Sequence, residues 1–321
     1  MYIVTGGAGF IGSAIVSRLN QDGINDILIV DNLTDSTKWK NLINLSYTDY
    51  IHKDKFIAYL DKIPSKDIQG IIHMGACSST TEMDVDYLME NNFRYTCQLA
   101  DFAYQNDIRF IYASSAATYG NGEYGYGDKE NFAELKPLNP YGYSKQIFDI
   151  WAHNKSYFDK IVGLKFFNVY GPNEYHKDEQ RSVVHKAFQQ IQETGSLKLF
   201  KSYIEEYKDG EQKRDFIYVK DCAAVIVWLL DNQDVSGLFN LGTGNARSWN
   251  DLAKAVFNAC SKDVNINYIE MPGNLKNQYQ YFTEAEMSKF SSLDSSMKFA
   301  SIEDGVKDYV QSYLLSNNKY L

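Results

Sequence analysis

The chain has 321 residues, a formal net charge of −9 at pH 7 and 44% hydrophobic residues, which is ordinary for a globular protein of about two lobes. The negative charge argues against nucleic acid as a general partner, because phosphate binding needs a basic face. Four scattered cysteines without a Cys-x-x-Cys pair indicate neither a disulfide framework nor a metal site. No secretory leader is apparent and the longest apolar run, 222–230, is too short to cross a membrane, so we expect a cytoplasmic protein without a membrane partner.

The first half of the sequence alternates short apolar runs with segments of helical periodicity. Buried strands are predicted at 2–5, 27–31, 70–74, 109–114 and 162–167. Helices are predicted between them at 11–21, 83–105 and 142–158. This repetition predicts an α/β fold with a doubly wound parallel sheet of the Rossmann type over residues 1–170, which would bind a dinucleotide.

After residue 170 the pattern becomes less regular. A charged stretch at 203–215 and a short strand at 237–242 indicate a smaller, irregular α/β lobe over residues 171–321. Helices at 249–260 and 302–314 are expected to complete it. We expect this lobe to hold the substrate, with part of the chain crossing back to the first domain.

The stretch TGGAGFIG, residues 5–12, follows the first strand and opens a helix. Its glycines allow a sharp turn and a close approach to a pyrophosphate, which the N-terminal end of the helix then binds. Asp31 ends the second strand 19 residues after Gly12, where a ribose-binding carboxylate is expected. Asp31 favours NAD because it suits a 2′-hydroxyl, whereas Lys38 and Lys53 suit a 2′-phosphate, so the residues alone leave both dinucleotides open.

The stretch NPYGYSK, residues 139–145, contains two tyrosines near a lysine. If a helix begins near residue 140, Tyr141 and Lys145 are four residues apart and share a face, whereas Tyr143 points elsewhere. A phenol has a reference pKa of about 10, and a nearby ammonium lowers it by roughly 1–3 units. Tyr141 is therefore the predicted acid/base. Ser115, near the end of a predicted strand, is placed to bond a substrate oxygen or simply to cap the strand.

These motifs resemble the extended short-chain dehydrogenase/reductase family, whose members modify nucleotide sugars. The resemblance also covers NVYGP at 168–172 and RDFIYVKD at 214–221. Dehydratases of the family carry Thr-Asp-Glu where this chain has Ser-Ala-Ala at 115–117, so the resemblance implies an epimerase. The resemblance narrows to nucleotide-sugar epimerases that act on ADP-heptose. It does so through four further stretches, at 75–82, 166–177, 239–244 and 275–283.

The resemblance implies an enzyme that inverts C6″ of the heptose through a ketone intermediate, to supply heptose for the lipopolysaccharide inner core. It also implies a bound nicotinamide cofactor, NADP or NAD, and favours NADP. Tyr141 and Lys177 are implied as the two acid/base groups, supported by Lys145 and Ser115. The implied cofactor-binding residues are Gly6, Gly9, Phe10, Ile11, Gly12, Asp31, Asn32, Lys38, Lys53, Met74, Gly75, Ala76, Cys77, Ser78, Asn91, Lys145, Val169 and Lys177. The implied substrate-binding residues are Ser115, Asn168, Glu179, Lys186, Phe200, Lys201, Ser202, Tyr203, Arg214 and Tyr279.

Some positions depart from the family pattern and leave alternatives open. Met74 stands where the family has Glu, residues 200–203 read FKSY instead of FEGS, and the loop at 203–213 is longer than usual. Whether His185 or Lys186 meets the substrate stays open, and the other histidines are expected to be ordinary core or surface residues. The alternatives are a UDP-hexose 4-epimerase, another nucleotide-sugar epimerase, or a dinucleotide-binding protein without catalysis. The family also suggests a homo-oligomer, namely a pentamer.

Overall fold

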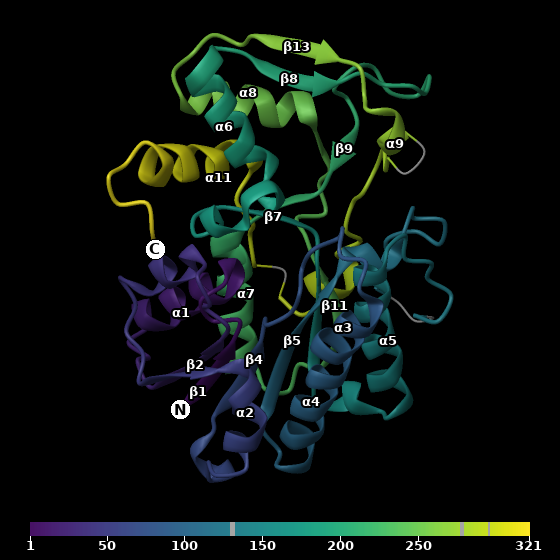
Figure 1. The fold of residues 1–321 in the computed structure, drawn as a ribbon. Coiled ribbons are helices and arrows are strands. Elements are labelled where there is room, and N and C mark those ends of the chain that lie inside the picture. The colour runs from purple at the N-terminus through teal and green to yellow at the C-terminus, as the bar shows by residue number, and fades with distance from the viewer. Residues whose placement is uncertain (129–131, 277–278, 295) are drawn as a thin grey trace.

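The computed structural model describes residues 1–128, 132–276, 279–294 and 296–321 (Figure 1). Seven parallel strands form its main sheet, in the order β11-β6-β5-β4-β1-β2-β3. Their bounds are β1 Tyr2–Thr5, β2 Ile27–Asp31, β3 Asp49–His52, β4 Gly70–His73, β5 Arg109–Ser115, β6 Val162–Phe166 and β11 Gly237–Leu241. The strands are rich in buried Ile, Val, Leu and Phe, as expected for a sheet covered on both faces.

Helices cover both faces of this sheet, which confirms the predicted doubly wound fold. One face packs against α1 (Phe10–Gln21) and α7 (Val219–Asp231). The other packs against α2 (Lys53–Leu60), α4 (Tyr95–Gln105) and α5 (Pro140–Asn154). The helix predicted at 83–105 is divided into α3 (Val85–Leu88), a π-helical turn η3 (Met89–Arg94) and α4. The short connecting helices are η1 Thr37–Leu42, η2 Ser65–Asp67, η4 Ala116–Tyr119 and η5 Tyr157–Asp159.

The strand predicted at 237–242 was expected in the smaller lobe, and the structure corrects this placement. As β11 it pairs with β6 at the edge of the main sheet, with all five of its residues buried. The apolar run 222–230 lies in α7, which packs against α1 beneath the sheet. The chain therefore returns to the first domain after residue 218. The division of the chain at residue 170 stays a prediction.

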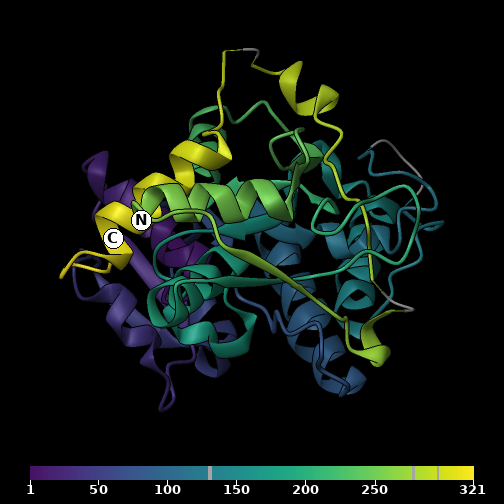
Figure 2. The same ribbon diagram turned by 90° about the horizontal axis from the view of Figure 1, so that it is seen from above.

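A smaller lobe lies over the carboxyl ends of the strands (Figures 1 and 2). It contains α6 (Val183–Thr194), α8 (Trp249–Ala259) and α11 (Ile302–Asp308), which continues into the π-helical η7 (Tyr309–Leu314). Its two-stranded pairs are β7 Asn168–Tyr170 with β10 Phe216–Tyr218, β8 Leu197–Phe200 with β13 Ile266–Ile269, and β9 Lys213–Arg214 with β12 Arg247–Ser248. The remaining short helices are η6 Tyr175–Gln180, α9 Gly273–Lys276 and α10 Ser288–Ser291.

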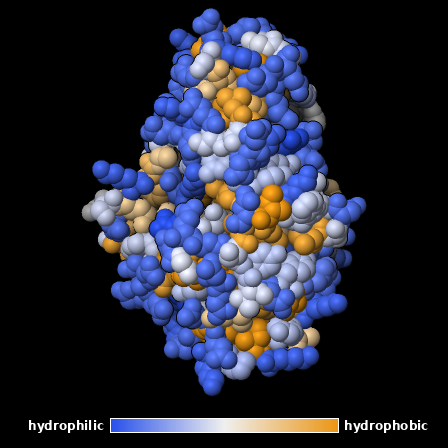
Figure 3. All heavy atoms as spheres, turned by 90° about the vertical axis from the view of Figure 1, so that its left-hand side faces the viewer, coloured by the Kyte–Doolittle hydropathy of each residue, from blue (hydrophilic) through white to orange (hydrophobic). Residues whose placement is uncertain are grey.

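Within the described ranges, every helix is too short or too polar to cross a bilayer. On the face shown in Figure 3, hydrophilic residues predominate and hydrophobic residues form small separate groups. All four cysteines are free thiols.

Candidate active site

A cavity of about 490 Å³ opens where the glycine loop leaves β1 and enters α1. We call it the glycine-loop cavity. It is lined by the predicted cofactor residues Gly6, Gly9, Phe10, Ile11, Gly12, Asp31, Asn32, Lys38, Lys53, Met74, Gly75, Ala76, Cys77, Ser78, Asn91 and Lys177. Two predicted cofactor residues, Lys145 and Val169, do not line it.

The glycine loop is shaped for a pyrophosphate. Gly6 has φ of +66°, and a Cβ on Gly12 would lie 2.1 Å from the Gly6 carbonyl oxygen. Only glycine fits these two positions without displacing the backbone. The first helical turn after Gly9 has no side-chain cap, so its N–H groups and the positive end of the helix dipole face the cavity. The residues present thus fit a dinucleotide.

Several residues of this cavity were missed by the sequence analysis: Thr5, Val30, Ser36, Tyr87, Tyr95, His176, Asp178 and Gln180. Thr5 and Val30 directly precede predicted site residues, so adjacency could have suggested them. Tyr87 and Tyr95 give no such signal, because only the packing of α3 and α4 brings them to the cavity. His176 was expected to be an ordinary core or surface residue; instead it lines the cavity, where burial lowers its pKa to about 4.

The Asp31 carboxylate accepts three hydrogen bonds from protein groups. Its Oδ2 accepts the Ala8 N–H at 2.9 Å, and its Oδ1 accepts the Asn32 N–H at 2.6 Å. The Lys38 ammonium also donates to Oδ1 at 2.7 Å, and Asp31 is only 6% exposed. Lys53 lines the same cavity, and its ammonium pairs with the Asp54 carboxylate at 2.9 Å. The end of the cavity next to β2 therefore holds two ammonium groups, each paired with a carboxylate.

A second cavity, of about 460 Å³, holds Tyr141 and is here called the Tyr141 cavity. The helix that carries Tyr141 begins at Pro140, because the Asn139 side chain caps it by accepting the Gly142 N–H at 2.8 Å. Tyr141 lines this cavity together with Ser115, whereas Tyr143 is 45% exposed and does not line it. The described residues that line the cavity include no formally charged side chain: Thr80, Thr81, Ser115, Ala116, Ala117, Gly120, Leu138, Asn139, Tyr141, Phe166, Phe167, Asn168, Gln280 and Thr283.

Burial dominates the ionisation of both groups in the Tyr-x-x-x-Lys pair. It raises the pKa of Tyr141, against the opposing effect of the Ser115 hydrogen bond. It lowers the pKa of Lys145 to about 8, and the Lys145 ammonium donates to the Ala113 carbonyl at 2.8 Å. The lowered phenol pKa expected from the i, i+4 spacing is therefore not found in this structure, because burial raises the pKa of Tyr141 and the Lys145 ammonium is bonded to the backbone.

Lys177 lies in η6, where Asp178 has φ of +45° and kinks the chain. Its ammonium stands 5.6 Å from the centre of the Phe10 ring, and burial lowers its pKa. Besides the glycine-loop cavity, Lys177 borders a third cavity of about 250 Å³, the Trp249 cavity, together with Asn168 and Trp249. Tyr141 does not line either of these, but Asn168 borders both the Tyr141 and the Trp249 cavities.

The predicted substrate residues are only partly gathered at these cavities. Arg214 is buried, with its guanidinium 5.7 Å from the Trp249 ring centre and 5.4 Å from that of Tyr279. Glu179 and Lys186 pair with each other at 3.6 Å on the surface, where Glu179 is 98% exposed. Residues 200–203 and Tyr279 lie outside the three cavities, as do Glu179, Lys186 and Arg214. His185 is buried, and burial lowers its pKa to about 4. Neither candidate at 185–186 lines one of the three cavities.

The glycine loop beside a Ser–Tyr–Lys group defines a nicotinamide-dependent enzyme of the short-chain dehydrogenase/reductase type. Residues 2–242 match the sequence pattern described as the NAD dependent epimerase/dehydratase family, and the chain belongs to this family. A curated relative from Nitratidesulfovibrio vulgaris, strain DP4, is named ADP-L-glycero-D-manno-heptose-6-epimerase. It is 54% identical over 324 aligned residues, with all of both chains covered.

Two solved structures share the fold closely. The ADP-L-glycero-D-manno-heptose-6-epimerase of Helicobacter pylori superposes with a TM-score of 0.81 at 28% identity, covering 97% of this chain and 95% of the other. The UDP-N-acetylglucosamine 4-epimerase of Methanobrevibacter ruminantium, in complex with UDP-N-acetylmuramic acid, also gives a TM-score of 0.81, at 26% identity and with 97% and 96% covered. Shape alone therefore does not separate a heptose epimerase from a hexose epimerase, whereas full-length sequence similarity does favour the former.

Proposed function

We propose that this chain converts ADP-D-glycero-D-manno-heptose to ADP-L-glycero-D-manno-heptose by inverting C6″, and so supplies heptose for the lipopolysaccharide inner core. The observation that carries the proposal is that Tyr141 and Ser115 line one cavity together with other hydroxyl and amide groups, and that the Ser115 side chain acts to lower the pKa of the Tyr141 phenol. Such a lining suits a polyol rather than a phosphate, and the phenol supplies a proton-transfer group at the sugar. The full-length 54% identity to the relative named above supports this particular substrate.

The bound nicotinamide supplies one kind of chemistry, which is to accept hydride from C6″ and return it to the opposite face. Tyr141 exchanges the proton of the C6″ hydroxyl, and Ser115 holds the oxygen in reach of the phenol. Lys145, charged below its pKa of about 8, places a positive charge one helical turn from Tyr141. Arg214, with its buried planar guanidinium, is suited to the diphosphate.

Inversion presents the same hydroxyl in two places, so a single fixed phenol serves one orientation. Lys177 is the proposed second acid/base, because its amine is buried and its pKa lowered. Tyr141 and Lys177 line different cavities that share Asn168 as a lining residue, so the two proposed proton-transfer groups approach the site from different elements.

NADP is the proposed dinucleotide. Asp31 already binds Ala8, Asn32 and Lys38, so it offers a 2′-hydroxyl little free acceptor capacity. Lys38 and Lys53, which are paired with Asp31 and Asp54, supply two ammonium donors for a 2′-phosphate. The protein is further proposed to work in the cytoplasm as a homo-oligomer.

The proposal is tested by denaturing the purified protein, identifying the released dinucleotide, and following ADP-heptose epimerisation with the same sample. UDP-glucose and UDP-N-acetylglucosamine serve as competing substrates. We expect NADP and turnover of ADP-heptose. Turnover of a UDP-hexose without turnover of ADP-heptose would contradict the proposed substrate, and release of NAD would contradict the proposed cofactor.

A further inference from the structure

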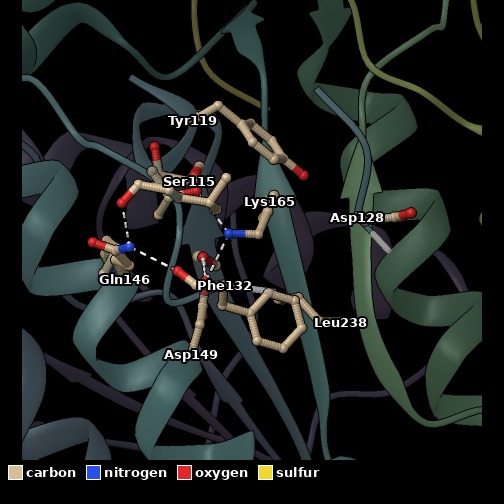
Figure 4. Close-up of polar contacts among 12 residues, drawn as sticks. Ser115, Tyr119, Asp128, Phe132, Gln146, Asp149, Lys165 and Leu238 are labelled. Carbon is tan, nitrogen blue, oxygen red and sulfur yellow. Dashed lines mark hydrogen bonds and ion pairs between the residues drawn. The ribbon is translucent and has the colours of Figure 1, made fainter. Parts of the chain in front are cut away.

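A buried ion pair lies directly behind the Tyr141 cavity. Lys165 on β6 and Asp149 on α5 are both 0% exposed, and their Nζ and Oδ2 atoms lie 2.8 Å apart. Figure 4 shows the Lys165 ammonium between the Asp149 carboxylate and the Tyr119 ring, whose centre is 5.1 Å away. A buried ion pair is weak evidence for added stability, because desolvation offsets much of its attraction. Its position therefore calls for another explanation.

The Asp149 carboxylate holds the end of β5. It accepts the Tyr112 hydroxyl at 2.7 Å and the Ser114 hydroxyl at 2.8 Å. These two residues flank Ala113, whose carbonyl accepts the Lys145 ammonium at 2.8 Å. Asp149 and Lys145 are one helical turn apart on α5, so the helix contacts the strand twice at the same place.

Lys165 extends this network to Ser115. Its ammonium donates to the Thr118 hydroxyl at 2.7 Å, and that hydroxyl donates to the Ser115 carbonyl at 2.9 Å. The backbone of Ser115 is thereby fixed, while its side chain lines the cavity that also holds Tyr141. The strand end with Ser115 and the helix with Tyr141 are connected through one pair of charges.

The pair also acts on the charge of Lys145. Burial alone would lower the pKa of Lys145 further. Two groups oppose this effect by raising the pKa, and the contribution of Asp149 is larger than that of Cys77. The other titratable neighbours are Tyr141 on the same helix and His73 on β4, whose pKa is lowered to about 3, so this imidazole is neutral at neutral pH. Asp149 is thus the fixed negative charge that favours a protonated Lys145.

We propose that the Asp149–Lys165 pair is a positioning element of the active site, which fixes the end of β5 against α5 and keeps the Lys145 amine protonated during turnover. Asp149 and Lys165 act through Lys145, Ser115 and Tyr141 rather than on the substrate. The inference deepens the proposed function, on which it rests for the role of Lys145.

The test is a neutral replacement of the pair, Asp149→Asn with Lys165→Met, which leaves no unpaired buried charge. The pH midpoint of Lys145 is measured in the whole protein by competitive labelling with acetic anhydride and mass spectrometry. We expect this midpoint to fall by up to about one pH unit relative to wild type, because Asp149 raises the pKa of Lys145 whereas Lys165, which is removed with it, is not among the groups that act on that pKa. The alkaline limb of the pH–rate profile for ADP-heptose epimerisation should move in the same direction.

Tyr112→Phe is the matched control, since it removes one hydrogen bond to the same carboxylate without changing any charge. It should lower the melting temperature and leave the Lys145 midpoint unchanged. If the double variant does not fold, Asp149→Asn alone serves, because an unpaired buried lysine loses its proton and the site again becomes neutral.

A folded variant with the wild-type Lys145 midpoint would overturn the inference. Failure of the wild type to epimerise ADP-heptose would instead overturn the proposed function, and the labelling result would still decide the role of the pair.

Discussion

Lys38 offers a direct test of the proposed dinucleotide preference. Its ammonium lies 2.7 Å from Asp31 Oδ1 and therefore neutralises the carboxylate. The Lys38 side chain is 22% exposed and lines the glycine-loop cavity. Replacement by alanine removes one charge-assisted hydrogen bond to a 2′-phosphate, worth about 1.5–3 kcal/mol. It also leaves the Asp31 charge to repel that phosphate. We expect the affinity for NADP to fall roughly 10- to 100-fold.

The affinity of Lys38→Ala for NAD should change little, because NAD lacks the 2′-phosphate. The measurement is a calorimetric titration of dinucleotide-free protein with NADP and with NAD at one fixed ionic strength, since salt screens such contacts. Lys40→Ala is the matched control: it removes the same charge from the same short helix, and Lys40 does not line the cavity. An equal loss for NADP and NAD, or no loss for either, would refute the reasoning.

Tyr141→Phe should lower kcat for ADP-heptose epimerisation about 100-fold or more, whereas Tyr143→Phe, at an exposed position, should match wild type in the same assay. Lys177→Met should lower kcat to a similar degree, and a wild-type rate in that variant would remove Lys177 from the mechanism. The pKa of His73 is lowered to about 3 by burial, so between about pH 6.5 and 3 the unfolded chain binds a proton that the folded chain does not. The free energy of unfolding should therefore fall as the pH falls through this window. His73→Gln should reduce the dependence of this free energy on pH by up to about 1.4 kcal/mol per pH unit, measured by urea unfolding at several pH values. An unchanged pH dependence would contradict this account.

The sequence by itself determined the features that depend on local spacing. The glycine loop was recognised because strand, loop and helix follow one another within a dozen residues. The choice of Tyr141 over Tyr143 followed from the helical repeat, and the structure places Tyr141 in a cavity and Tyr143 on the surface. The doubly wound fold and the family resemblance are likewise confirmed, whereas the roles of the individual site residues stay predictions.

Only the tertiary structure decided the features that depend on non-local pairing. The sequence of β11 predicts a short strand in an irregular region. Its place beside β6 is fixed by burial on both faces, which the sequence pattern does not indicate. β3 was missed because it is short and mostly unburied. The contact of Lys38 with Asp31, and that of Lys165 with Asp149, join residues whose spacing carries no signal. Local periodicity thus identifies which residues can share a face, but the packing of distant elements decides which charges meet and which are desolvated.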